Sequence, residues 1–315
     1  MPKKTSVPVL AASLLVASIA TAQASDPAAC QTVNFAEVGW ADIAATTGLA
    51  TTVLQGLGYK TKTQMLSIPM AYQAMEMKSI DVYLGAWMPS MAAISTPFLE
   101  KGSVERVRTN LTGAKYTLAV PDYAYEAGLK RFEDIARFKD ELQGRIYGIE
   151  AGNDGNQIIQ GLIDKDSYGL KGFRLVDSSE AGMLVEVRRA VRSKKPIVFL
   201  GWEPHPMNSQ LSMRYLSGGD AEFGPNYGAA VVDTHTRKGF GQECPNVGAL
   251  LSRMAFELGM ESQIMGAILN DKQKPALASR EWLKRNPQVL ENWLAGVTTF
   301  DGQPGASAVR SYLGL

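Results

Sequence analysis

The chain has 315 residues, of which 45% are hydrophobic and 20% are charged, and its formal net charge is +1. No block of like charges and no low-complexity tract interrupts this near-neutral composition. The balance therefore argues against a protein that binds nucleic acid or an anionic membrane surface.

Residues 1–24 have the pattern of a secretory signal peptide. Lys3 and Lys4 precede the apolar run "VPVLAASLLVASIATA", and Ala22-Gln23-Ala24 provides a small-x-small cleavage site. The apolar run is short for a membrane span, and no second one follows it. We therefore expect cleavage near Ala24 and a soluble protein in the periplasm. Loss of the two lysines would change the net charge from +1 to −1.

The chain has two cysteines, Cys30 and Cys244. A charge and a proline separate Cys30 from the apolar run, which argues against a lipid attachment site. In an oxidising compartment we expect the pair to form a disulfide, and the alternative is two buried free thiols. A metal site is not expected, because the chain has two histidines and neither cysteine belongs to a CxxC pair.

After Cys30 the sequence alternates between strand-like and helix-like segments. We expect strands near 33–38, 60–67 and 80–85, and helices near 41–56, 69–78 and 90–100. A βαβαβ order of this kind predicts a parallel sheet with helical crossovers.

A second alternating unit begins after the polar turn residues near 108–115. It contains the expected strands 116–121, 145–150, 172–177 and 196–202 and the expected helices 132–142, 154–166 and 178–194. Beyond residue 207 the sequence is turn-rich with short strands, and from Pro245 onward it is largely helical.

The expected disulfide would return this helical tail to the first unit. We therefore predict an α/β clamshell of two lobes, each with a parallel or mixed sheet flanked by helices. Lobe 1 comprises residues 25–112 and 210–315, and lobe 2 comprises residues 113–209. Two crossovers, near 112 and 210, would form the hinge.

Three of the five tryptophans, Trp40, Trp87 and Trp202, follow a strand and a glycine within two residues. Ligands in open α/β sheets bind at the carboxyl ends of strands, so these side chains would meet in one cleft. Tyr116, in the first strand of the second unit, would add a fourth ring. The alternative for each ring is ordinary core packing. That alternative is stronger for Tyr116 and fits Trp282 and Trp293 of the helical tail.

Several aromatic faces around one space favour a cationic ligand. Ring faces are electronegative, and aromatic cages bind quaternary ammonium groups. A primary amine would also need hydrogen-bond acceptors, whereas a trimethylammonium group needs none. A sugar stacked on tryptophan is the alternative that the aromatic residues alone leave open.

Two polar residues stand beside these aromatic segments. Asp42 follows Trp40 and is interpreted either as a helix N-cap or as a carboxylate at the cleft that accepts a hydrogen bond from a ligand hydroxyl. Asn153 precedes a helix and is interpreted either as a turn residue or as an amide that contacts the polar end of the ligand. His205, between two prolines, is expected to support the loop of Trp202.

Five segments of the sequence resemble a known family. They are "EVGWAD", "YLGAWMPS", "AKYTLAVP", "IEAGNDGN" and "VFLGWEPHPMN". These segments are similar to those of the periplasmic binding proteins for choline and glycine betaine, which are the soluble components of ABC uptake systems. The similarity extends from about residue 30 to the C-terminus and is greatest to the choline-binding members.

The resemblance implies a type II periplasmic binding protein that is monomeric, needs no metal or other cofactor, and passes its ligand to a membrane permease. It implies an aromatic box for the trimethylammonium group formed by Trp40, Trp87, Tyr116 and Trp202. It also implies contacts of the choline hydroxyl with Asp42 and Asn153, and a disulfide between Cys30 and Cys244.

Choline is preferred to glycine betaine because Asp42 would repel the carboxylate of betaine and attract a hydroxyl-bearing cation. Lys115 stands beside Tyr116, but alternation along the strand would direct it away from the cleft. A binder of glycine betaine or carnitine and a sensory module that reports the ligand to a receptor remain alternatives. An enzyme is not expected, since no nucleophile and base pair, metal set or flavin fingerprint is present.

Overall fold

The computed structural model describes residues 26–315. The expected signal peptide over residues 1–24, with its cleavage near Ala24, lies outside the described residues. Within the described part of the chain, no helix has both the length and the hydropathy needed to cross a bilayer.

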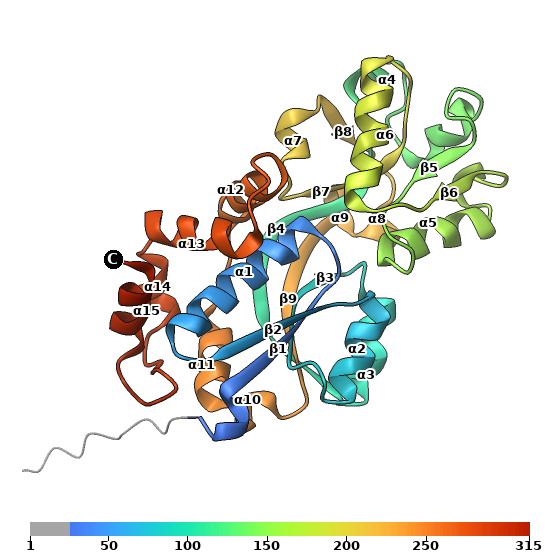
Figure 1. Ribbon diagram of the computed structural model, residues 1–315. Coiled ribbons are helices and arrows are strands. Elements are labelled where there is room, and N and C mark those ends of the chain that lie inside the picture. The colour runs from blue at the N-terminus through green and yellow to red at the C-terminus, as the bar shows by residue number, and fades with distance from the viewer. Residues whose placement is uncertain (1–25) are drawn as a thin grey trace, which may run out of the picture.

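The first alternating unit has the expected elements. Its strands are β1 (Thr32–Glu37), β2 (Lys60–Met65) and β3 (Val82–Met88), and its helices are α1 (Ala41–Gly56), α2 (Ile68–Glu76) and α3 (Ala92–Glu100). Strand β1 pairs in parallel with both β2 and β3, as the βαβαβ order predicted. Helices α2 and α3 lie on one side of these strands and α1 on the other (Figure 1).

Helix α1 is buried along most of its length although it is rich in threonine. The hydroxyl groups of Thr51 and Thr52 donate to the carbonyls of Thr47 and Gly48 at 2.8 and 2.7 Å, which satisfies them inside the helix. A Cβ at Gly48 would clash with the side chain of Ser279. The composition of α1 therefore allows it to serve as a central helix against which the C-terminal helices pack.

The second unit is built on shorter elements. Its strands are β5 (Arg145–Tyr147), β6 (Arg174–Val176), β7 (Phe199–Glu203) and β8 (Met213–Tyr215). Its helices are α4 (Asp122–Glu126), α5 (Asp154–Asp164), α6 (Glu180–Arg192), α7 (Met207–Gln210), α8 (Asp220–Phe223) and α9 (Pro225–Gly228). The expected helix 132–142 is instead a 3-10 helix over Phe132–Phe138, and a second 3-10 helix covers Ser167–Gly169.

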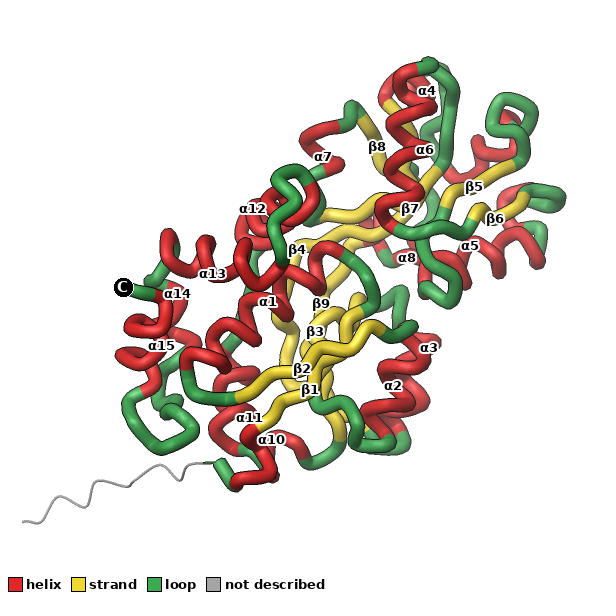
Figure 2. Tube along the Cα trace, in the orientation of Figure 1, coloured by secondary structure: helices red, strands yellow, loops and turns green. Residues whose placement is uncertain are grey.

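Two long strands join the units into one mixed sheet with the order β2-β1-β3-β9-β4-β7-β5-β6, while β8 pairs with β4. Strand β4 (Val104–Pro121) runs antiparallel to β9 (Ala229–Arg237) through Lys115, and from Lys115 onward it pairs with β7. Figure 2 shows these strands passing from one body of the protein to the other. The expectation that only short strands follow residue 207 is wrong for β9.

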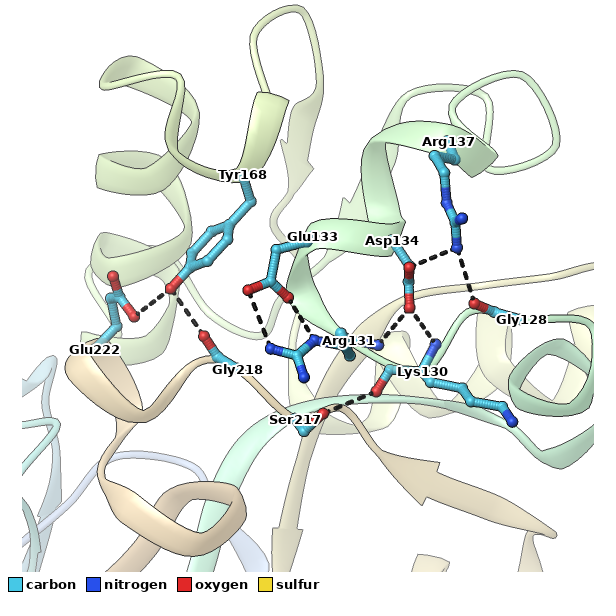
Figure 3. Close-up of polar contacts among 10 residues, drawn as sticks. All are labelled: Gly128, Lys130, Arg131, Glu133, Asp134, Arg137, Tyr168, Ser217, Gly218 and Glu222. Atoms are coloured by element: carbon cyan, nitrogen blue, oxygen red, sulfur yellow. Dashed lines mark hydrogen bonds and ion pairs between the residues drawn. The ribbon is translucent and has the colours of Figure 1, made fainter.

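Residues 213–222 pack with the second unit. Strand β8 pairs with the end of β4, and Figure 3 shows Tyr168 donating to the carbonyl of Gly218 and to Glu222, at 2.9 and 3.0 Å. The lobe boundaries given above stay a prediction, but these contacts favour a second crossover later than residue 210. We place it near residues 224–229, where Gly224 and Gly228 have φ angles of 107° and 73°.

The helices that follow β9 complete the first unit, and those over Leu258–Leu269, Pro275–Arg285 and Gly305–Leu313 pack on α1 (Figure 1). They are α10 (Phe240–Glu243), α11 (Pro245–Arg253), α12 (Leu258–Leu269), α13 (Pro275–Arg285), α14 (Val289–Trp293) and α15 (Gly305–Leu313). The expected disulfide is confirmed, with the Cα atoms of Cys30 and Cys244 5.7 Å apart. Trp282 and Trp293 are buried in this helical layer, in agreement with their expected packing role.

Candidate functional site

A cavity lies where the two units meet, with about 260 Å³ of empty space when the part that opens to solvent is included. We call it the aromatic cavity. The first unit contributes Trp40, Asp42 and Trp87, and the second unit contributes Tyr116, Ile149, Asp154 and Trp202. All four predicted rings and Asp42 therefore line one space, whereas Asn153 is not among the lining residues and Ile149 and Asp154 were not predicted.

The four rings reach the cavity from different kinds of element. Trp40 is the N-cap of α1 and lies past β1, as expected. Trp87 and Trp202 lie inside β3 and β7, so the expectation that each follows its strand is wrong for these two. Both strands extend because a neighbour pairs with them there: Trp87 is opposite Val232, and Trp202 is opposite Tyr116.

The glycine near each tryptophan has a steric reason. Gly39 has a φ angle of +92°, which side chains rarely adopt, and it turns the chain between β1 and α1. A Cβ at Gly85 would lie 2.8 Å from Ile43, and a Cβ at Gly201 would lie 2.9 Å from Ala119. The repeated Gly-Trp pattern thus reflects a turn in one place and close packing behind the ring in the others.

The rings lie close together at steep angles. The centroids of Trp87 and Tyr116 are 6.0 Å apart with an interplanar angle of 56°, and those of Tyr116 and Trp202 are 6.4 Å apart at 75°. The four side chains are 4–6% exposed. Rings inclined in this way surround a compact group rather than form a flat stacking platform.

The polar atoms of three rings are bound to acceptors. Trp40 Nε1 donates to Glu150 at 2.9 Å, which joins the two units, and Trp87 Nε1 donates to Asp42 Oδ2 at 2.9 Å. The Tyr116 hydroxyl donates to Asn153 Oδ1 at 3.0 Å. These bonds fix the orientation of the rings.

Asp42 is the second residue of α1, and its side chain accepts a hydrogen bond from Trp87 Nε1. The N-cap interpretation is wrong, because Trp40 occupies that position. The carboxylate is 4% exposed, and its Oδ1 atom has no hydrogen-bond partner among the described residues. Burial, with a further contribution from Glu180, raises the pKa of Asp42 to about 6. An unpartnered oxygen beside aromatic faces is suited to accept a hydroxyl from a ligand.

Asn153 is the N-cap of α5, and its Oδ1 atom accepts from the backbone N–H of Asn156 at 3.0 Å. The same oxygen accepts from Tyr116, and Nδ2 donates to Asp154 at 2.9 Å. Asn153 thus has a structural role, but as the cap of a helix with extended backbone rather than as the expected turn residue. A direct contact with a ligand stays a prediction, for which the second hydrogen of Nδ2 is available.

Glu180 joins the two units behind the rings. One carboxylate oxygen accepts from the backbone N–H of Ala41 at 2.8 Å, and the other lies 3.1 Å from His205 Nε2. Because the N–H of Met207 donates to His205 Nδ1 at 2.9 Å, the proton of a neutral His205 is on Nε2 and points to Glu180. The His205 ring centroid is 4.9 Å from that of Trp202, which confirms its expected supporting role.

Comparison with known proteins agrees with this geometry. The model of the OpuAC family, described as the substrate binding domain of ABC-type glycine betaine transport systems, matches residues 31–285. The chain belongs to this family. Its members are solute-binding proteins of ABC transport, and the predicted periplasmic binding protein fold is confirmed.

Three solved structures are informative. An ABC-transporter choline-binding protein in complex with choline is 55% identical, with a TM-score of 0.91 over 91% of this chain and 100% of that one. A choline-binding protein in an unliganded semi-closed conformation is 56% identical, with the same coverage and a TM-score of 0.84. Lactococcal OpuAC, closed on glycine betaine, is 25% identical, with a TM-score of 0.75 over 83% and 98% of the chains. The present structure is thus more similar to the choline-bound form than to the semi-closed one.

Proposed function

We propose that this protein binds choline in the aromatic cavity and delivers it to the permease of an ABC uptake system. The observation that carries the proposal is the combination of four buried rings with the unpartnered oxygen of Asp42 in one cavity. The complex of the 55% identical protein with choline supports it.

In the proposed complex the trimethylammonium group lies against the faces of Trp40, Trp87, Tyr116 and Trp202. A cation over an aromatic face gains about 2 kcal/mol or more when both are desolvated, which the burial of these rings provides. The choline hydroxyl donates to Asp42 Oδ1 and accepts from the free hydrogen of Asn153 Nδ2. The rings thus bind the charge, and the two polar residues orient the other end.

The size of choline explains why the cavity must be closed. The ligand has about seven non-hydrogen atoms, and the best small ligands gain about 1.5 kcal/mol per atom. Micromolar affinity needs about 8.2 kcal/mol, or roughly 1.2 kcal/mol per atom, which is close to that limit. Contacts from one unit would not suffice, so we infer that ligand binding favours hinge closure.

Glycine betaine and carnitine are the alternative ligands. Each carries a carboxylate that needs N–H donors and would be repelled by Asp42. In the described part of the chain, no lysine or arginine lines the aromatic cavity. Lys115 is paired with Glu203 at 3.1 Å instead.

Calorimetric titration with choline and with glycine betaine tests the proposed ligand. We expect clearly tighter binding of choline, and a preference for glycine betaine would contradict the role given to Asp42. Choline recovered intact after incubation, measured by mass spectrometry, would support a binding protein without turnover. A role as a sensory module would be favoured if deletion of the permease left the cellular response to choline unchanged.

The location and assembly of the mature protein belong to the same proposal. We propose cleavage near Ala24, export to the periplasm and a monomeric state. Mass spectrometry of the protein from a periplasmic extract tests the cleavage position. Light scattering of the same material tests the assembly.

A further inference from the structure

Asp154 is a buried carboxylate of the aromatic cavity that has no place in the proposed choline contacts. It is the first residue of α5 and is 2% exposed. Its Oδ1 atom accepts from Asn153 Nδ2 at 2.9 Å, and its Oδ2 atom has no hydrogen-bond partner among residues 26–315. Leaving a buried charged oxygen unpaired is unfavourable, so a ligand group that compensates it is expected in the cavity.

The environment of Asp154 is strongly acidic. Asp42 lines the same cavity from the first unit and also has one unpartnered oxygen. Glu180 raises the pKa of Asp42, and Asp154 and Glu180 both raise the pKa of Glu150. Burial raises the pKa of Asp154 to about 6, against the opposing effects of the Ser90 hydroxyl and of the N–H groups at the start of α5.

One ligand hydroxyl cannot satisfy both free oxygens, since it donates a single hydrogen bond. Positive charge on the ligand would compensate the second carboxylate beyond what the Ser90 hydroxyl provides. We propose that Asp154 is a second ligand-facing carboxylate and that Asp42 and Asp154, one from each unit, make the cavity select ligands of net positive charge. This inference rests on the proposed function and adds a residue that determines specificity.

The position of the two carboxylates also links charge to closure. Asp42 and Asp154 belong to different units, so they line one cavity only when the units are together. Without a cation, closure brings like charges into a space of low polarity, which is unfavourable. A monocation with a small polar end offsets this cost, whereas a zwitterion with the same headgroup adds a third carboxylate. The closed form would thus depend on the charge of the ligand as well as on its shape.

Calorimetry of Asp154→Asn with choline and with dimethylbutanol, the neutral carbon analogue of choline, separates charge from shape. We expect choline to bind about tenfold more weakly and the neutral analogue to bind as well as before, so that the preference for the cation falls about tenfold. Glycine betaine should bind the variant more tightly than it binds the unmodified protein. Asp164→Asn removes the same charge from the exposed end of α5 and should leave the preference unchanged.

If Asp154→Asn lowers the affinity for both ligands equally, or changes neither affinity, the inference is overturned and Asp154 has only a structural role. If the unmodified protein fails to bind choline, the proposed function and this inference are both overturned. That outcome is distinguishable from failure of the inference alone, in which the unmodified protein still binds choline. If Asp154→Asn does not fold, Asp42→Asn provides the test, because Asp154 is then the remaining carboxylate of the cavity lining.

In Asp42→Asn protein, choline affinity should still fall between about pH 7 and about pH 5, while that of dimethylbutanol stays level. Glu150, Glu180, His205 and Glu261 also face this region, but none of them lines the cavity. Equal pH profiles for the two ligands would overturn the inference.

Discussion

The tryptophans of the aromatic cavity and those of the C-terminal helices are buried to the same degree, but their surroundings differ. Trp87 and Trp202 are each 4% exposed, and Trp282 and Trp293 are 5% and 3% exposed. Trp293 packs edge-on against Phe256 with ring centroids 5.9 Å apart. The cavity tryptophans instead share their space with carboxylates that have free oxygens. Burial alone therefore does not identify a binding ring, whereas an unpaired charge beside it does.

The largest effect is expected for the packing tryptophan. Trp293→Ala removes a fully packed ring from the helical layer and should lower the free energy of unfolding by about 3–5 kcal/mol. Denaturant titration measures this change. Because Trp293 lies outside the cavity lining, choline affinity of the folded fraction should stay within about twofold. If Trp293→Ala instead lowers choline affinity strongly and leaves stability unchanged, the contrast between the aromatic cavity and the C-terminal helices is not valid.

Trp202→Ala should give the opposite pattern. The loss of one ring face from the cavity should weaken choline binding about 100-fold, equivalent to about 2.7 kcal/mol, while the protein still unfolds cooperatively. Calorimetry gives the affinity, and thermal unfolding with and without choline reports the loss of ligand stabilisation. Unchanged choline binding by this variant would show that Trp202 is only a packing residue.

Affinity for choline should also depend on pH. The pKa values of Asp42 and Asp154 are raised to about 6 by burial, and a bound cation favours their charged forms. Protons therefore compete with the ligand as the pH falls through this range, and choline affinity should decrease about tenfold between pH 7 and pH 5. Titrations across this range measure the change. An affinity that rises on acidification would contradict the sign of the effect.

The smallest effect is expected at the cap of α5. Asn153→Ala removes both the cap and the acceptor of the Tyr116 hydroxyl, and it should cost about 1 kcal/mol of stability. Asn153→Ser keeps a capping oxygen and should cost less. If the amide also contacts the ligand, both variants should weaken choline binding by a few fold. A loss of affinity in the alanine variant alone would restrict Asn153 to its structural role.

The sequence was sufficient to predict the first unit closely, because its elements are local. The expected helix 41–56 is α1 as observed, and the strand near 33–38 is shifted by one residue. The long strands β4 and β9 were not foreseen as a pair. Their extent depends on pairing between residues more than 100 positions apart, which no local pattern records. The pairing of β8 with β4 is likewise non-local, and it favours a second crossover later than the predicted one near residue 210.

The candidate site was predicted in its aromatic part, because a tryptophan that closely follows a glycine near the end of a strand is a visible pattern. Asp154 was missed, since "NDGN" is also typical of an ordinary turn. The side chain that would face the ligand depends on where α5 begins. The helix begins at Asp154, so Asn153 became the cap and Asp154 became the residue in the cavity. The sequence pattern does not determine at which of these two residues the helix begins, and therefore which of them faces the cavity.

A crystal structure of the protein with choline tests the central claim most directly. The account predicts that the choline nitrogen lies within about 6 Å of the ring centroids of Trp40, Trp87, Tyr116 and Trp202. The hydroxyl should lie within hydrogen-bond distance of Asp42. Choline bound away from these four rings, or oriented with its hydroxyl among them and its ammonium group in solvent, would contradict the account.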